Sequence, residues 1–96
     1  MSIRLIITST AQPGKGNELA AHYRERCLPV LQEPGCLQYE AFQSKLDPDR
    51  FVMIEHWTDK EALAAHLKLS ATRPPIPSHL RAGKGQREDY EYNRTR

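Results

Sequence analysis

The spacing of hydrophobic residues changes several times along this 96-residue chain, and those changes limit the folds that it can adopt. Some segments show the two-residue alternation of strands, and others show the three-to-four-residue spacing of a helix with one buried face. Proline and glycine, which interrupt regular structure, stand between most of them. The predicted strands are 2–10, 36–45, 51–57 and 87–93, and the predicted helices are 16–33 and 59–70.

Individual residues refine the ends and faces of these elements. Pro29 should kink or end the first helix, because proline removes a backbone donor. Thr58 and Glu61 have the spacing of a capping box, which would start the second helix. In the second strand, Leu37 and Tyr39 should lie on the same side, since alternate strand residues share a face.

The order β-α-β-β-α-β is that of a split βαβ arrangement. We therefore expect an α+β, ferredoxin-like fold, in which a four-stranded antiparallel sheet carries both helices on one face. A single domain should span 1–96, with a Pro/Gly-rich irregular connection at 71–86 and a tail at 94–96.

The open face of such a sheet would also carry apolar side chains, namely Phe42, Val52 and Ile54. An apolar face on so small a domain favours a partner, so we predict a homodimer through the sheet face, closed as a dimeric α+β barrel. The net charge of +2, with alternating signs in the tail, predicts no nucleic-acid partner. The longest apolar run, Leu5-Ile6-Ile7, predicts no membrane span, and we expect a soluble, cytoplasmic protein.

No spacing of cysteine or histidine predicts a metal site. Cys27 and Cys36 match no metal or redox motif, and free thiols suit a reducing cytosol. The histidines, which form neither an HxxxH motif nor a facial triad, are His22, His56, His66 and His79.

Several short motifs nevertheless occur in an order that resembles a known family. They are Pro13-Gly14-Lys15, Glu33-Pro34-Gly35-Cys36 with Tyr39, Asp47-Pro48-Asp49-Arg50-Phe51, Glu55 with Trp57, and Ala62-Leu63 with His66. Together they resemble the antibiotic biosynthesis monooxygenase domain family. The resemblance implies a dimeric ferredoxin-like α+β barrel. It also implies small enzymes that oxidise quinols, anthrones or similar aromatics with dioxygen and use no cofactor, neither metal nor flavin.

The sequence departs from that family after His66. Members commonly continue with a small residue, a proline and a second histidine. Here the chain reads Leu67-Lys68-Leu69-Ser70-Ala71-Thr72 and then the proline-rich segment 73–77. The wall that this region builds is therefore remodelled, and no histidine replaces the missing one by position.

The candidate catalytic residues are His66, Glu55 and Trp57. The candidate substrate-binding residues are Tyr39, Tyr23, His22, Met53, Phe51 and Leu63. Trp57 shares a strand face with Glu55, and His66 lies about two turns into the following helix, on its apolar side. An imidazole there could act as an acid or a base near neutral pH.

Structural roles compete with these assignments. Trp57 could be an ordinary core aromatic residue and His66 a buried, hydrogen-bonded one. Glu55 could be paired with an arginine, of which Arg4, Arg24 and Arg26 are the candidates.

The hypothesis is therefore a cofactor-independent monooxygenase for a small quinol, phenolic or polyketide-like aromatic substrate. The base (His66 or Glu55) would deprotonate the substrate, and the resulting anion would pass an electron to dioxygen. The alternative is a non-catalytic dimeric barrel that binds a small apolar or aromatic ligand. The first reading predicts a hollow of a few hundred Å³ beside Trp57, into which His66 or Glu55 opens.

Overall fold

The computed structural model describes residues 2–83 and 85–91. The predicted order of strands and helices is confirmed, with a short 3₁₀ turn before the last strand. Residues Tyr92, Asn93 and the predicted tail at 94–96 lie outside the described part of the chain. The elements are β1 (Ile3–Thr10), α1 (Gly16–Val30), β2 (Cys36–Gln43), β3 (Arg50–Trp57), α2 (Lys60–Ser70), η1 (Ser78–Leu80) and β4 (Gln86–Glu91).

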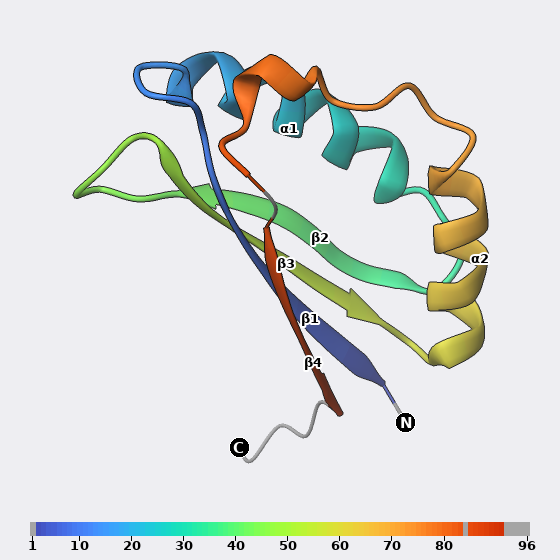
Figure 1. Cartoon of the computed structure of the whole chain (residues 1–96). Helices are drawn as coiled ribbons and strands as arrows, with labels where there is room; N and C mark the ends of the chain where they lie inside the picture. The colour runs from blue at the N-terminus through green and yellow to red at the C-terminus, as the bar shows by residue number, and fades with distance from the viewer. Residues whose placement is uncertain (1, 84, 92–96) are drawn as a thin grey trace.

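The four strands form one antiparallel sheet in the order β2-β3-β1-β4, as the ferredoxin-like prediction requires. Both helices lie on the same side of this sheet, and β4 forms the edge next to β1 (Figure 1). No helix within the described ranges combines the length and the apolar character needed to cross a bilayer.

Strand β3 places its alternate side chains under the helices. Phe51, Met53, Glu55 and Trp57 are all buried, whereas the side chains between them are only half-buried. Glu55 lies opposite Leu5 in the register of β1 and β3, so the carboxylate enters the apolar layer near the middle of the sheet.

Strand β2 does not alternate as predicted. The register with β3 shifts between Cys36 and Gln38, which marks a bulge. Cys36 and Tyr39 consequently pack toward the core, while Leu37 is 56% exposed. Leu37 and Tyr39 both line the space beside α1, as expected for a shared side, but only Tyr39 packs against the core.

Helix α1 ends earlier than predicted, at Val30, and holds Pro29 in its last turn. Its start is fixed by Asp49, whose carboxylate accepts the backbone N–H groups of Gly14 and Gly16 at 3.0 and 2.9 Å. Gly16 lies so close to the backbone of Pro48 that a Cβ would stand 2.0 Å from its carbonyl oxygen.

Helix α2 is capped by Asp59, and the predicted capping box at Thr58 is wrong. The Asp59 carboxylate accepts from the Ala62 N–H at 2.8 Å. Gly35 packs against this turn: with φ of +81°, a Cβ there would lie 2.5 Å from the Ala62 Cβ. The loop that contains Glu33 is therefore held against the start of α2.

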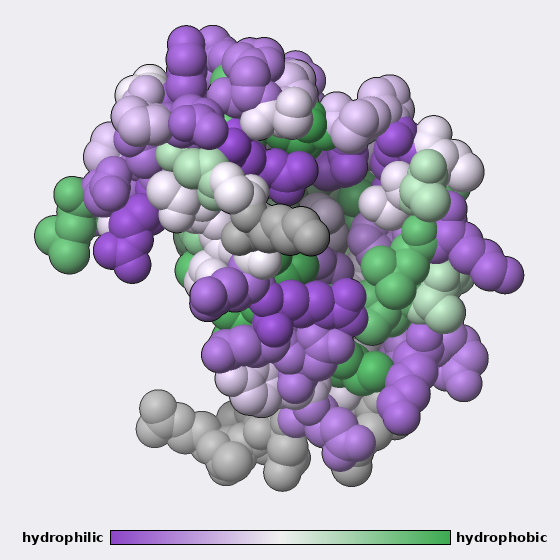
Figure 2. Space-filling model, in the orientation of Figure 1, coloured by the Kyte–Doolittle hydropathy of each residue, from purple (hydrophilic) through white to green (hydrophobic). Residues whose placement is uncertain are grey.

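The core consists of two clusters of buried residues, and Tyr39 packs against both. One contains Leu19, Tyr23, Phe51 and Met53; the other contains Ile3, Leu5, Val30, Trp57 and Leu63. The surface in Figure 2 mixes hydrophilic and hydrophobic residues, and Leu46 in the β2–β3 connection is 94% exposed.

Candidate functional site

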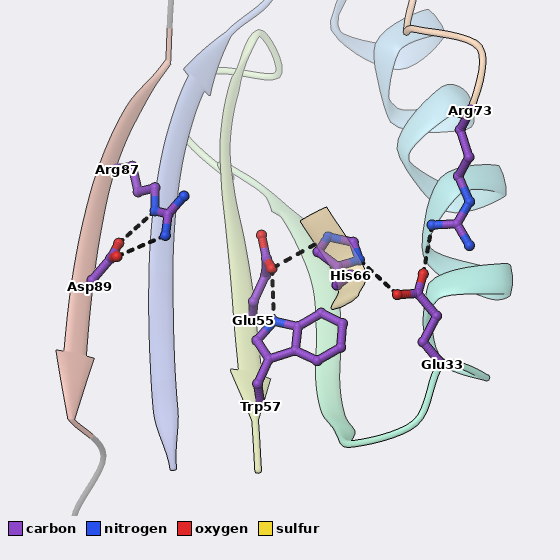
Figure 3. A network of polar contacts seen from close by, with 7 residues as sticks. All are labelled: Glu33, Glu55, Trp57, His66, Arg73, Arg87 and Asp89. Carbon is purple, nitrogen blue, oxygen red and sulfur yellow. Dashed lines mark hydrogen bonds and ion pairs between the residues drawn. The ribbon is translucent and has the colours of Figure 1, made fainter. Parts of the chain in front are cut away.

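A row of polar side chains crosses the apolar layer between the sheet and the helices (Figure 3). It begins at Arg73, which donates from Nη1 to Glu33 Oε2 at 2.6 Å. Glu33 Oε1 lies 2.9 Å from His66 Nδ1, and His66 Nε2 lies 4.0 Å from Glu55 Oε1. The same Glu55 oxygen accepts the indole N–H of Trp57 at 3.0 Å. We call these five residues the buried polar row.

Four separate segments of the chain supply the buried polar row. Glu55 and Trp57 are two positions apart on β3, so both point under the helices. His66 comes from the buried side of α2, next to Leu63 in the helical repeat. Glu33 comes from the α1–β2 connection and Arg73 from the segment after α2, so only the complete fold brings the row together.

The part of the row formed by Glu55, His66 and Trp57 is almost completely removed from water. Glu55 is 4% exposed, His66 is 5% exposed and Trp57 is fully buried. Burial raises the pKa of Glu55, while the hydrogen bond from Trp57 and the nearby His66 act in the opposite direction. A buried carboxyl beside an imidazole is an arrangement that occurs often at sites of proton transfer.

Two aromatic rings contact the imidazole. The Trp57 and His66 ring centroids are 4.6 Å apart with an interplanar angle of 31°, and the Tyr39 ring centroid lies 5.5 Å from that of His66. Burial raises the pKa of Tyr39, and the charge of Glu55 acts in the same direction. Tyr39 is therefore a neutral phenol, able to donate a hydrogen bond.

The remaining predicted residues divide between the two core clusters. Leu63 packs with Trp57, whereas Tyr23, Phe51 and Met53 belong to the other cluster. Tyr23 meets Phe51 edge to face, and its hydroxyl lies 2.9 Å from Ser9 Oγ. His22 is half-buried on α1 and makes none of the contacts that join the buried polar row.

The predicted pairing of Glu55 with an arginine of β1 or α1 is wrong. Glu55 instead contacts Trp57 and His66. Arg4 follows Ile3 and precedes Leu5, both buried under the helices, so it points to the opposite face. Arg26 donates to the backbone carbonyl of Pro74.

Hollows of several hundred Å³ open at two places on the described part of the chain. The first, of about 530 Å³, lies between α1 and β2, and we call it the α1–β2 groove; its lining includes Arg24, Cys27, Leu28, Leu37, Tyr39 and Phe51. The second, of about 710 Å³, lies at the hairpin end of the sheet, and its lining includes Thr8, Phe42, Leu46 and Val52.

Neither of these hollows is lined by Trp57, Glu55 or His66, so the predicted opening beside Trp57 is not found at either of them. The α1–β2 groove reaches Tyr39, whose ring contacts His66. Tyr39 thus separates the groove from the imidazole.

Sequence reasoning missed Glu33 and Arg73 as members of the site. Glu33 is the first residue of the Glu33-Pro34-Gly35-Cys36 motif, and this motif is the sequence feature that could have identified Glu33 as a site residue. Arg73 carries no local signal, because it precedes a proline-rich segment whose path the sequence does not define. Within 2–83 and 85–91, no group of three or more His, Cys, Asp or Glu side chains is arranged to hold a metal ion.

The fold and the site define a small α+β domain with an acid–imidazole pair enclosed between its helices and its sheet. The sequence profile of the antibiotic biosynthesis monooxygenase family matches residues 2–74. The chain therefore belongs to that family. No functionally curated protein matches the chain in sequence.

Solved structures agree with this assignment. A protein from Pseudomonas aeruginosa is 30% identical with a TM-score of 0.78, over 97% of this chain and 95% of that one. A protein from Chloroflexus aurantiacus, provisionally named an antibiotic biosynthesis monooxygenase, is 25% identical with a TM-score of 0.75, over 100% and 97%. A conserved protein from Methanosarcina mazei, 20% identical with a TM-score of 0.78 over 97% and 94%, shows likeness of fold alone.

Proposed function

We propose that this protein is a cofactor-independent monooxygenase that acts on a small quinol, phenolic or polyketide-like aromatic substrate. The observation that supports it best is the buried contact between His66 and Glu55, placed against the rings of Trp57 and Tyr39. Burying ionisable groups in so small a core costs stability, and ionisable groups with perturbed pKa values cluster at functional sites.

The net charge of the buried polar row is compatible with accepting a proton from a substrate. Arg73 and Glu33 form an ion pair whose charges cancel, with side chains 18% and 7% exposed. The rest of the row is then neutral when one proton resides either on Nε2 of the His66 imidazole or on the Glu55 carboxyl. A second proton, taken from a substrate hydroxyl, would give the His66–Glu55 pair a net charge of plus one. This positive charge would stabilise the neighbouring substrate anion.

The reaction then needs only the substrate and dioxygen. The phenolate transfers one electron to dioxygen, and the resulting substrate radical and superoxide combine at a ring carbon as a peroxide anion, which the proton held by the base converts to a hydroperoxide. Loss of water from that hydroperoxide leaves a carbonyl, so phenol and dioxygen give quinone and water, and the proton held by the base returns in the water. Trp57, Leu63, Met53 and Phe51 would supply the apolar surroundings, with Tyr39, Tyr23 and His22 as donors to the substrate oxygen.

The α1–β2 groove is the proposed entrance. Its volume of about 530 Å³ falls in the range of ordinary small-molecule sites. Tyr39 lies at the boundary between this groove and His66, so its hydroxyl is suited to meet the substrate first.

Oxygen uptake with a panel of quinols, naphthols and anthrones tests this function. Replacing the base, His66→Ala, should reduce uptake at least about a hundredfold, the usual contribution of a general base. The control is His79→Ala, because His79 is exposed on η1 and contacts Glu18 instead of a residue of the buried polar row. Unchanged uptake in His66→Ala would exclude His66 as the base.

One observation favours the alternative, a non-catalytic barrel that binds a small aromatic or apolar ligand. The side chains of Glu55, His66 and Trp57 are closed off from both hollows. Trp57 is the single tryptophan, so its fluorescence reports binding in the neighbourhood. Saturable quenching by the quinol panel without oxygen uptake would support the binding protein.

We also propose a homodimer through the open sheet face. Val52 and Ile54 are half-buried there and Phe42 is exposed, while the 710 Å³ hollow lies on the same face beside Leu46. Ile54→Lys would place a charge in that interface, and sedimentation should then show a monomer where the parent chain sediments as a dimer. Cys27 and Cys36 carry free thiols, which is why we also propose the cytoplasm as its location.

A further inference from the structure

Glu33 uses both of its carboxylate oxygens inside the protein. Oε1 lies 2.9 Å from His66 Nδ1, and Oε2 accepts from Arg73 Nη1 at 2.6 Å. The Glu33 side chain is itself 7% exposed. Figure 3 shows Glu33 between the guanidinium and the imidazole, on the side of the ring away from Glu55.

We propose that Glu33 and Arg73 are positioning residues that hold His66 in its Nδ1–H tautomer, with Nε2 turned toward Glu55 as the nitrogen that exchanges the proton. This inference rests on the proposed function for its catalytic consequence. The tautomer itself is independent of any substrate.

The tautomer follows from the chemistry of the acceptor. An ionised carboxylate accepts hydrogen bonds and cannot donate them, so the 2.9 Å contact requires a proton on Nδ1. The hydrogen bond made by one ring nitrogen decides the state of the other, which leaves Nε2 unprotonated in the neutral ring. Arg73, always a cation, keeps Glu33 an acceptor by balancing its charge.

The second half of the row fits this assignment. His66 Nε2 and Glu55 Oε1 are 4.0 Å apart, which is too far for a direct hydrogen bond. Proton exchange between them therefore requires a third oxygen, from water or from a substrate hydroxyl.

The segment that carries Arg73 is held in place by a second contact. Arg26 of α1 donates to the backbone carbonyl of Pro74, the residue after Arg73. The chain after α2 is thus attached to α1 next to the point where Arg73 reaches Glu33. This attachment explains how a residue outside regular structure can be placed well enough to orient a buried ring.

Nitrogen-15 NMR of protein labelled at histidine tests the inference directly. The chain has four histidines, and His66→Asn assigns the signal of His66. In the parent protein, Nδ1 of the neutral ring should give a protonated shift and Nε2 an unprotonated one. An Nε2–H ring in the parent protein would overturn the proposal without any variant.

Variants separate positioning from simple support of the fold. Glu33→Ala should convert His66 to the Nε2–H tautomer that histidine prefers in water, whereas Glu33→Gln, whose amide oxygen still accepts, should keep Nδ1–H. Glu18→Ala is the matched control, because Glu18 faces the exposed His79 at 3.9 Å. An unchanged tautomer in a folded Glu33→Ala would refute the positioning role.

Kinetics adds the catalytic half of the test. Glu33→Ala should lower kcat for a quinol substrate at least about tenfold, with KM changed less than about twofold, because the base is misplaced while the binding surface is intact. An Nδ1–H ring in a protein that consumes no oxygen would support the tautomer and defeat the proposed function. A protein that consumes oxygen and has an Nε2–H ring would support the proposed function and refute the tautomer.

Discussion

The hydrogen bond between Trp57 and Glu55 gives a quantitative test of the buried polar row. Trp57→Phe deletes the indole donor, 3.0 Å from Glu55 Oε1, and keeps an aromatic ring beside His66. The lost bond to a carboxylate should cost about 1.5–3 kcal/mol. The smaller ring leaves a void that should cost about 1–2 kcal/mol more. We therefore expect the free energy of unfolding to fall by about 2.5–5 kcal/mol.

A double-mutant cycle with Glu55→Met separates the two contributions. In the Glu55→Met background the carboxylate acceptor is absent. Trp57→Phe then removes side-chain volume, but it no longer deprives a buried carboxylate of its hydrogen-bond donor. Its cost should then fall to about 1–2 kcal/mol, which gives a coupling energy of about 1.5–3 kcal/mol. The measurement is urea unfolding at pH 8 and at one protein concentration, because the stability of a dimer depends on concentration.

The pH dependence and a control complete this test. When Glu55 takes up a proton at low pH, the acceptor becomes neutral and the coupling should fall to about 1 kcal/mol. Tyr23→Phe, which deletes the contact with Ser9 in the other core cluster, should be additive with Glu55→Met. A Trp57–Glu55 coupling below about 0.5 kcal/mol at pH 8 would refute the reasoning, because distant, independent sites give values of that size.

Two further substitutions test the burial of Glu55 and the packing of the loop before β2. Burial raises the pKa of Glu55 above its ordinary 4.5, so the folded state binds this proton more tightly than the unfolded state. The resulting stabilisation is complete below pH 4.5 and is lost as pH rises through the folded-state pKa, by about 1.4 kcal/mol per unit of the shift. Urea unfolding should show this loss in the parent protein and not in Glu55→Gln. Gly35→Ala should lower the free energy of unfolding by at least about 3 kcal/mol, because strain at positive φ adds to the clash with Ala62. Gly14→Ala, at φ of +79° with open space around it, should cost only about 1 kcal/mol, and equal losses in the two variants would show that the clash is relieved.

The sequence was sufficient for the order of the elements and for the buried side of β3. Hydrophobic periodicity and the breaks at proline and glycine are local properties, and they fixed where strands and helices form. The alternation of side chains along a strand is covalent geometry, so Trp57 and Glu55 had to share a face. Local signals failed where neighbours competed for one role, as when Asp59 rather than Thr58 capped α2.

Tertiary structure alone decided which groups meet at the site. Glu33 and His66 are 33 positions apart and Glu33 and Arg73 are 40 apart, so no local pattern relates them. The bulge in β2 also interrupts the alternation of side chains there, and the hollow lies beside Tyr39 instead of Trp57. Periodicity determines the face on which a side chain emerges. Its interaction partners depend on how separate segments pack. A buried charge needs ion-pair or hydrogen-bond partners, and here these come from distant parts of the chain.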